Sequence, residues 1–550
     1  MSEICGLTIK ETARLFKAGD LSPVELVEAA LRRIESLDPQ VNAFLTLTGD
    51  LARAQARKAE KEIHAGHHRG PLHGIPIGLK DIYCTAGIRT TGHSKVFEHY
   101  VPAEDAAAVA KLYGAGAILV GKLATHELAH GGPSFDLPWP PARNPWNTDH
   151  FTGGSSSGSA AAVAAQFVMG ALGSDTGGSI RTPASLCGIV GLKPTYGLVS
   201  RRGVIPNSYS FDHCGPMTRT VEDCAALLQA IAGFDDKDPT SCNRPPLDYC
   251  AALTGDIRGL RIGVLRHFWE EDLPVHDELR AALENALDLL ARLGAKVEVA
   301  RIRPLQEYYD IWNLIEASEI LSVHHANLIQ RTEDFGSHFL GRTLAACVIQ
   351  SGDYVDAQRA RRRMVEEMES LYARYDLLLA PGSGPAPRLG ARCKTWPKPN
   401  SFVPFNMTGG PALVICIGFS STGLPLAMQL AGRPFDEPTL FRVADAYEKA
   451  TTWHTAHPLL VPGTTSVPII EDNGSPTPLS PETDDATLGL CPALMRHLGL
   501  TLTDTQLMQV CHAASQFLRM INRTQSFNKR SAEPANVFNA LDCIRRSGPE

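Results

Sequence analysis

Two turns rich in glycine and serine, on either side of a run of small residues, set the strongest constraint on how this chain folds. The first turn, 153–159, reads GGSSSGS, the small residues are 160–165, and the second turn, 173–181, reads GSDTGGSIR. Glycine lets the backbone take positive φ and approach a ligand closely, and consecutive amides in such turns can bind an anion. Serine supplies a nucleophile or a proton carrier. The stretch predicts a backbone shaped to face a reacting group.

One lysine upstream is placed for burial. Lys80 lies at the end of an apolar strand predicted over 74–82, after Ile75, Ile77 and Leu79. A lysine has an ordinary pKa of about 10.4, and it acts as a base only where burial or nearby cations lower that pKa. Alone, Lys80 would be interpreted as a lysine at a strand end that reaches solvent. Together with the serine turns, it indicates a serine hydrolase with lysine as its base.

Two other motifs in the first turn fit their usual contexts poorly. Residues 154–158 match G-x-S-x-G, which needs a strand before it and a sharp turn into a helix. The preceding residues 143–148, RNPWNT, do not form a strand pattern. A phosphate-binding P-loop requires a lysine after its last glycine, and Ser159 follows Gly158 here. Neither a nucleophile elbow nor a P-loop is therefore expected.

A zinc-dependent hydrolase is the remote alternative. His126, Glu127 and His130 form H-E-x-x-H, which on a helix places two histidines on one face to bind zinc and offers the glutamate as base. Glycines and Pro133 follow at once and would stop such a helix, and no glutamate lies between Glu127 and Glu222 to serve as a third ligand. The simpler interpretation is a loop or short helix whose polar groups lie near a pocket.

Strand and helix patterns alternate over some 450 residues, which predicts an α/β architecture with a sheet covered on both faces. A capping box at 22–25 begins the first amphipathic helix. Helices are predicted over 23–37, 51–65, 105–113, 276–293, 354–375 and 438–451. Strands are predicted over 42–48, 74–82, 117–120, 260–265, 297–302, 377–379, 413–419 and 424–430.

Composition narrows the class of protein. The chain has 550 residues and a net charge of −7 that is spread along it. This charge distribution does not suggest the basic surface by which proteins bind nucleic acid. The longest apolar runs, such as 412–417, are too short to span a bilayer, and the N-terminus lacks the apolar segment of a secretory signal. Thirteen scattered cysteines without a C-x-x-C pair indicate reduced thiols in a cytoplasmic protein.

A change in composition predicts three parts. Residues 1–462 would form the catalytic domain, 463–486 a linker rich in Gly, Pro, Ser and Thr, and 487–550 a small helical appendix. Helical spacing over 492–498 and 503–521 puts apolar residues on one side. This stripe must pack on the main body or on another subunit, and a homodimer through it is one expectation.

Several motifs in order resemble the amidase signature family, and the match covers roughly residues 7–458. They are GIPIGLKD at 74–81, RNP at 143–145, GGSSSGSA at 153–160, GSDTGGSIR at 173–181, PAS at 183–185, GLKPTYG at 191–197, FNMTG at 405–409 and GLP at 423–425. The resemblance implies a mixed sheet of about eleven strands wrapped by helices. The appendix is distantly similar to the small helical partner subunit of carboxybiuret-type amidohydrolases, as though fused to the main chain.

The resemblance also implies a Ser–cis-Ser–Lys catalytic unit. Ser179 would be the nucleophile, Lys80 the base, and Ser155 the bridging serine after a cis Gly154–Ser155 peptide bond. Neutral Lys80 would take a proton from Ser155, which takes one from Ser179. The backbone amides of four residues would form the oxyanion hole: Thr176, Gly177, Gly178 and Ser179. Asp175 and Arg181 would hold the turn, unless they form only a surface ion pair.

The predicted activity is hydrolysis of a linear amide, or of a related carbamate or urea bond, in a small molecule. Neither a metal nor an organic cofactor is required, and no nucleic-acid or membrane partner is expected. The first alternative is a glutaminase-type component of an amidotransferase, like the A subunit of the tRNA-dependent enzymes, which would need partner subunits. A further alternative is an assembly scaffold with an inactive core, against which the intact Lys80, Ser155 and Ser179 argue.

Overall fold

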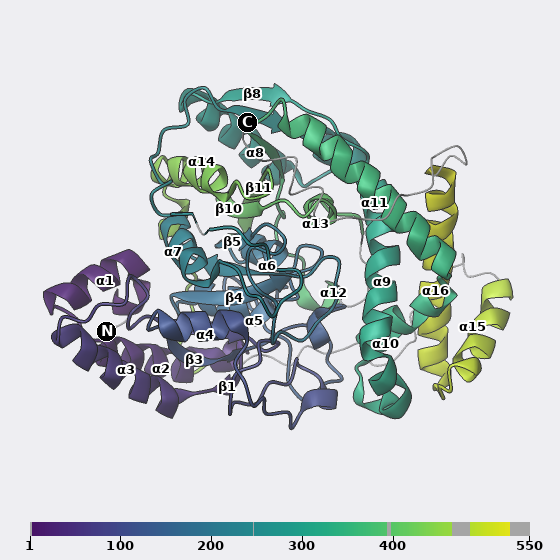
Figure 1. Cartoon of the computed structure of the whole chain (residues 1–550), viewed down its shortest axis with the longest axis horizontal. Helices are drawn as coiled ribbons and strands as arrows, with labels where there is room; N and C mark the ends of the chain where they lie inside the picture. Colours follow the sequence, from purple (N-terminus) through teal and green to yellow (C-terminus); the bar gives the residue numbers. More distant parts are fainter. Residues whose placement is uncertain (1–2, 246, 393–397, 465–484, 528–550) are drawn as a thin grey trace.

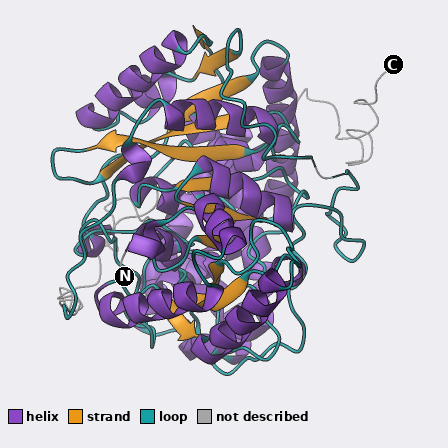
Figure 2. Ribbon diagram, turned by 90° about the vertical axis from the view of Figure 1, so that its left-hand side faces the viewer, coloured by secondary structure: helices purple, strands orange, loops and turns teal. Residues whose placement is uncertain are grey.

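One mixed sheet runs through the molecule (Figures 1 and 2). The computed structural model describes residues 3–245, 247–392, 398–464 and 485–527. These residues form a sheet of eleven strands in the order β1-β3-β2-β4-β6-β5-β10-β11-β9-β7-β8. Figure 2 shows the strands as a band between helices, which confirms the predicted α/β architecture. The strands are β1 (Phe44–Leu47), β2 (Pro76–Lys80), β3 (Ile118–Leu123), β4 (Gly170–Asp175), β5 (Val190–Lys193), β6 (His213–Thr218), β7 (Arg261–Val264), β8 (Lys296–Val299), β9 (Leu377–Pro381), β10 (Ala412–Phe419) and β11 (Pro425–Gly432).

The pairing of β2 with β4 brings the two halves of the predicted site together. The two strands are parallel, with Leu79 opposite Leu172, and every residue of both is buried. Because the carboxyl ends of parallel strands lie at one edge of a sheet, Lys80 at the end of β2 and Asp175 at the end of β4 share that edge. Open α/β sheets bind their ligands at this edge.

Helices cover both faces of the sheet. The six predicted over 23–37, 51–65, 105–113, 276–293, 354–375 and 438–451 each begin and end within a few residues of the prediction, and the remaining helices before residue 450 were not predicted. Ser22 and Glu25 form the predicted capping box of the second helix. The helices are α1 (Ile9–Ala18), α2 (Pro23–Leu37), α3 (Gly49–His64), α4 (Ala107–Gly114), α5 (Ser157–Ala164), α6 (Arg181–Leu186), α7 (Val221–Ile231), α8 (Asp277–Arg292), α9 (Leu305–Gln330), α10 (Ser337–Thr343), α11 (Ser351–Tyr372), α12 (Leu389–Arg392), α13 (Val403–Met407), α14 (Glu437–Lys449), α15 (Asp485–His497) and α16 (Asp504–Phe527).

The two glycine-serine stretches are shorter as turns than the sequence suggested. Helix α5 already begins at Ser157, and strand β4 continues to Asp175, so residues 157–159 and 173–175 belong to regular elements. Every residue of α5 is buried. A Cβ at Gly158 would lie 2.4 Å from the Ala124 nitrogen and 2.5 Å from the Ala43 oxygen. Small residues are required here because the helix touches neighbouring backbone directly.

The C-terminal helices pack on the main body. Helix α16 contacts α9, α10 and α11, and α15 contacts α16. Val510, Ala514 and Phe517 on α16 are buried within the main hydrophobic core, so the predicted apolar stripe has its partner within this chain. The domain boundaries stay a prediction: most of the linker 463–486, and residues 528–550 of the appendix, lie outside the described residues. Among the described helices, none is long and apolar enough to cross a membrane.

Candidate active site

Lys80 is buried and does not reach solvent, as its combination with the serine turns indicated, and its amine donates hydrogen bonds to two serines. Its side chain has no exposed surface. Lys80 Nζ donates to Ser155 Oγ at 2.7 Å and to Ser174 Oγ at 2.8 Å. Burial lowers the pKa of Lys80 to about 7, although Asp212 and Asp175 partly oppose that change. A substantial fraction of this amine is therefore neutral near pH 7, as a base must be.

Ser155 follows a cis Gly154–Ser155 peptide bond, as expected from the family resemblance. Its carbonyl oxygen accepts hydrogen bonds from the amides of His126 at 3.0 Å and Ser157 at 2.8 Å. The imidazole of His126 also lies against Gly154, where a Cβ would come within 2.1 Å of the ring. The backbone around the middle serine is thus fixed from two sides.

Ser179 is joined to the same region through backbone. Its carbonyl oxygen accepts a hydrogen bond from the Ser156 amide at 3.1 Å, which holds the end of the second turn beside the first. A bond between the hydroxyl groups of Ser155 and Ser179 is not among the hydrogen bonds of the described residues. The structure therefore places Lys80 and Ser155 in direct contact and connects Ser179 to them through the neighbouring Ser156.

Asp175 and Arg181 form a buried ion pair, so the surface interpretation of this pair is wrong. Both side chains have no exposed surface, and two guanidinium nitrogens of Arg181 lie 2.9 Å from the two carboxylate oxygens of Asp175. Arg181 also donates to Asn406 Oδ1 and Gln429 Oε1. Burial by itself raises the pKa of Asp175, but Arg181 and the Asn406 amide together lower it below its usual value. The pair stays ionised and fixes the turn between its two members.

The turn from Thr176 to Ser179 carries the amides predicted for the oxyanion hole. The Gly178 amide donates to Asp175 Oδ1 at 2.8 Å, so in this structure it bonds within the turn. Thr176 Oγ1 donates to Asp212 Oδ1 at 2.7 Å, and the Thr176 carbonyl accepts from Trp312 Nε1 at 3.0 Å. Contacts on both sides of the peptide chain therefore hold this turn in place.

Four residues of the site were not predicted from sequence: Ser174, Asp212, Trp312 and Asn406. Ser174 lies five residues before Ser179, within the stretch 173–181 that was predicted as a turn, but no role was assigned to it from the sequence. The other three come from distant segments. Asn406 belongs to the family motif at 405–409, but nothing in the sequence around Asp212, Trp312 or Asn406 indicates a contact with the turn.

A cavity of about 270 Å³ adjoins this edge of the sheet. Ser174, the second hydrogen-bond acceptor of Lys80, is part of its wall. Ala129 and Ile205 supply apolar surface, and Asn207 and Arg201 supply polar groups. A volume of this size can hold a small organic molecule next to the serine–lysine pair.

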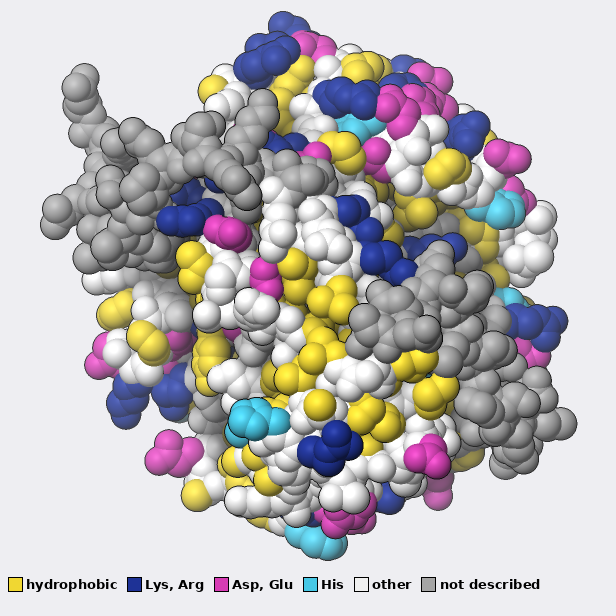
Figure 3. All heavy atoms as spheres, turned by 90° about the vertical axis from the view of Figure 1, so that its right-hand side faces the viewer, with side chains coloured by type: hydrophobic (Ala, Val, Ile, Leu, Met, Phe, Trp, Pro, Cys, Tyr) yellow, Lys and Arg dark blue, Asp and Glu magenta, His cyan; other side chains and the backbone are white. Residues whose placement is uncertain are grey.

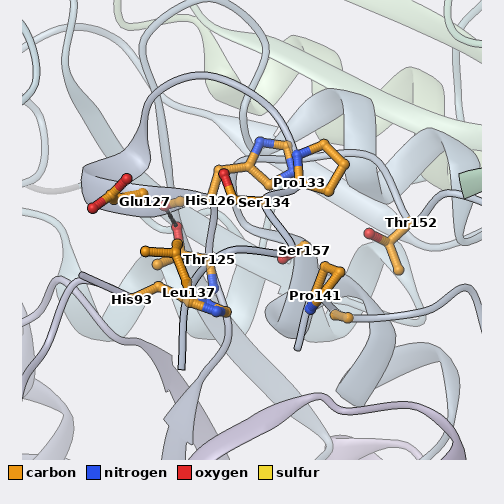
Figure 4. Close-up of a pocket in the computed structure, with 11 residues that line it drawn as sticks. His93, Thr125, His126, Glu127, Pro133, Ser134, Leu137, Pro141, Thr152 and Ser157 are labelled. Carbon is orange, nitrogen blue, oxygen red and sulfur yellow. Dashed lines mark hydrogen bonds between the residues drawn. The ribbon is translucent and has the colours of Figure 1, made fainter. Parts of the chain in front are cut away.

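The zinc motif has no metal-binding geometry. His126, Glu127 and His130 do not share a helical face, because Leu128 between them has a φ of 48°. Figure 4 shows the His126 ring and the Glu127 carboxylate pointing away from each other. Glu127 accepts from Ser94 Oγ at 2.6 Å, and His130 Nδ1 lies 2.7 Å from Glu316 Oε1. No group of three potential metal ligands occurs within the ranges that the structure describes.

Comparisons with known proteins assign the family. A family model described as Amidase matches residues 25–441. The chain belongs to the amidase signature family. This membership makes it an amidase-type hydrolase of carbon–nitrogen bonds. Helix α16 lies outside the residues that the family model matches.

Two solved structures and one curated relative show how far the likeness extends. The chain is 42% identical to the A subunit of the glutamyl-tRNA(Gln) amidotransferase of Geobacter metallireducens, over 82% of this chain and 99% of that protein. It superimposes on the peptide amidase of Stenotrophomonas maltophilia with a TM-score of 0.72 and 32% identity, over 84% and 99% of the two chains. A protein from a complex related to an s-triazine catabolic enzyme gives a TM-score of 0.76 at 32% identity, over 82% and 100%.

Proposed function

We propose that the protein hydrolyses a linear amide, or a related carbamate or urea bond, through an acyl-enzyme on Ser179. The single observation that carries this proposal is the buried Lys80 amine, hydrogen bonded to Ser155 Oγ at 2.7 Å with a pKa of about 7. An amine that is neutral in part at pH 7 can take a proton from the serine it contacts. The two turns themselves, 153–159 and 173–181, contain neither a lysine nor a histidine that could act as this base.

The proton then moves in two steps. Ser155 gives its proton to Lys80 and takes one from Ser179, whose oxygen attacks the amide carbonyl carbon. The amides of Thr176, Gly177 and Ser179 would stabilise the oxyanion, and Gly178 would join them only if its bond to Asp175 is released. The proton returns to the leaving nitrogen, and water then hydrolyses the ester on Ser179.

Replacement of the three residues tests the proposal directly. Ser179→Ala is expected to abolish turnover and labelling by a fluorophosphonate, because the nucleophilic oxygen is absent. Ser155→Ala should lower kcat by at least about 10²-fold, since the proton path is broken. Ser159→Ala is the matched control: its hydroxyl donates to the Leu172 carbonyl at 3.0 Å, away from Lys80. Full activity of Ser179→Ala on any accepted amide would refute the proposal.

A second candidate is a glutaminase that works as one component of an amidotransferase, and the identity of 42% to such a component favours it. The two functions differ in what the purified chain does alone. A self-sufficient amidase hydrolyses aryl, alkyl or ureido amides without a partner. A glutaminase component would prefer glutamine and would gain activity when its partner proteins are added. A panel of these substrates, assayed with the single chain, separates the two.

The predicted homodimer remains a proposal. Figure 3 shows hydrophobic side chains gathered near the centre of the face that lies on the side of α15 and α16. Leu490 on α15 and Met508 on α16 are among the exposed large hydrophobic residues. Light scattering coupled to gel filtration measures the mass directly, and a mass of one chain would refute the dimer. A cytoplasmic location likewise remains a prediction from the scattered cysteines.

A further inference from the structure

Helix α9 lies between the nucleophile turn and the C-terminal helix α16. It contacts α16, α10, α11 and α13, and Figure 1 shows it standing between the sheet and α16. The helix is 26 residues long, and many of its polar residues are buried, among them Asp310, Asn313 and Glu316. Buried polar groups must be paired, so their partners show what the helix holds together.

One stripe of α9 contacts the loops of the active-site edge. Trp312, Glu316 and Glu319 recur at intervals of four and three residues, which places them on one side of a helix. Trp312 donates to the Thr176 carbonyl at 3.0 Å, Glu316 bonds His130, and Glu319 accepts from the Ser210 amide at 3.0 Å. The Trp312 ring also covers Gly177, where a Cβ would lie 2.4 Å from the ring. This stripe thus sets the position of the oxyanion turn.

A different side of α9 faces the C-terminal helix. Asp310, two residues before Trp312, points about 200° away around the helix. Its carboxylate has no exposed surface and accepts two bonds from Arg523 of α16, at 2.6 Å and 2.8 Å. Gln306, one turn earlier in α9, donates to the same carboxylate at 2.7 Å. Arg523 thus binds both carboxylate oxygens of Asp310 and supplies the positive charge opposite this buried acid.

We infer that Arg523 is a positioning residue for the catalytic turn: it anchors α9 through Asp310, and α9 in turn holds Thr176 and Gly177 through Trp312. The C-terminal appendix would then be a working part of the active site, although it lies outside the family match at residues 25–441. This inference rests on the proposed function, because it concerns the amides that would stabilise the oxyanion.

The physical reason is that the oxyanion amides act only at the correct position. Small displacements of a catalytic group cost large factors in rate, while ground-state binding of substrate depends on other walls of the pocket. Loss of the Arg523 charge leaves Asp310 buried without its cation, and the segment around Trp312 is then free to shift. The effect should fall on kcat and leave KM nearly unchanged.

The test compares Arg523→Gln, Arg523→Lys and Trp312→Phe, each alone and Arg523→Gln with Trp312→Phe. Rates are expressed per active site, counted by fluorophosphonate labelling, so that misfolded protein does not contribute. Arg523→Gln should lower kcat by about tenfold, with KM within about twofold, and Arg523→Lys should restore part of the loss. The double variant should be no slower than Trp312→Phe alone, because both changes act on the same path.

Arg362→Gln is the matched control, since Arg362 pairs with the exposed Glu366 on α11 and should leave kcat unchanged. The inference is overturned if Arg523→Gln retains the wild-type kcat. It is also overturned if the fold-decrease in kcat of the double variant equals the product of the fold-decreases of the two single variants. Finally, it is overturned if Arg523→Gln lowers only the fraction of protein that is labelled and leaves kcat per labelled site unchanged, which would indicate a structural role only. If the wild-type chain is neither labelled at Ser179 nor active on amides, the proposed function fails instead.

Discussion

Lys80→Met is expected to make the protein inactive and, at neutral pH, more resistant to unfolding than the wild type. Methionine has a similar length and no charge, so it fills the same buried site between Ser155 and Ser174. The folded protein lowers the pKa of Lys80 from 10.5 to about 7. The unfolded chain therefore binds more protons than the folded one between these two values, and wild-type stability rises with pH across this window.

The magnitude follows from this difference. One pKa unit corresponds to about 1.4 kcal/mol, so the buried lysine costs about 4 kcal/mol at pH 7 and about 2 kcal/mol at pH 9. Loss of the two hydrogen bonds offsets part of the gain in the methionine variant, by about 0.5–1.5 kcal/mol for each bond. That offset does not depend on pH over this range. The stability advantage of Lys80→Met should therefore shrink by about 2 kcal/mol between pH 7 and pH 9.

Urea unfolding of both proteins at several pH values measures this difference, and all other titrating groups cancel in the comparison. In parallel, kcat/KM of the wild type should rise with pH through a midpoint near 7, where the amine loses its proton. A stability difference that stays constant from pH 7 to pH 9 would refute the lowered pKa. A flat pH profile of kcat/KM would refute the role of Lys80 as base.

Two further changes test the packing that holds the site. Asp175→Asn leaves Arg181 buried without its charge partner and should lower the free energy of unfolding by about 3–5 kcal/mol; a loss below about 1 kcal/mol, measured by urea unfolding, would contradict the buried pair. Gly158→Ala places a Cβ 2.4 Å from the Ala124 nitrogen and should destabilise the protein by about 1–3 kcal/mol. The control is Gly352→Ala on α11, where a Cβ would have open space around it. This variant should be more stable than the wild type by about 0.5–1 kcal/mol. Equal melting temperatures for the two variants would contradict close packing at Gly158.

Local patterns predicted much of this molecule. The capping box at Ser22 and Glu25 is a contact between neighbours in sequence, and the structure places the helix where it predicts one. The apolar run before Lys80 predicted a strand, and only its combination with the serine turns indicated a buried lysine with a lowered pKa; in the structure the strand and the lysine are both buried, and burial lowers the pKa of Lys80. The central strands β4, β5 and β6 were not predicted, because glycine, serine and proline in them lower their strand propensity and only their burial in the sheet makes them strands.

Helix α9 was not predicted from local sequence patterns. It is buried on several sides, so it lacks the single apolar stripe by which a helix is predicted. The buried acids Asp310 and Glu316 interrupt the apolar pattern further, and the sequence does not reveal that Arg523 and His130 pair with them.

The amino-acid sequence by itself determined the strand that ends in Lys80, the glycine and serine turns, and the order in which they occur, because each depends on residues close together in the chain. The tertiary structure alone decided that Ser174 shares the Lys80 amine and that Trp312 covers Gly177. It also decided that a helix near the C-terminus supplies the cation for Asp310. Such contacts join segments that are up to some two hundred residues apart, and only the packing of the sheet and its helices brings them within hydrogen-bond distance.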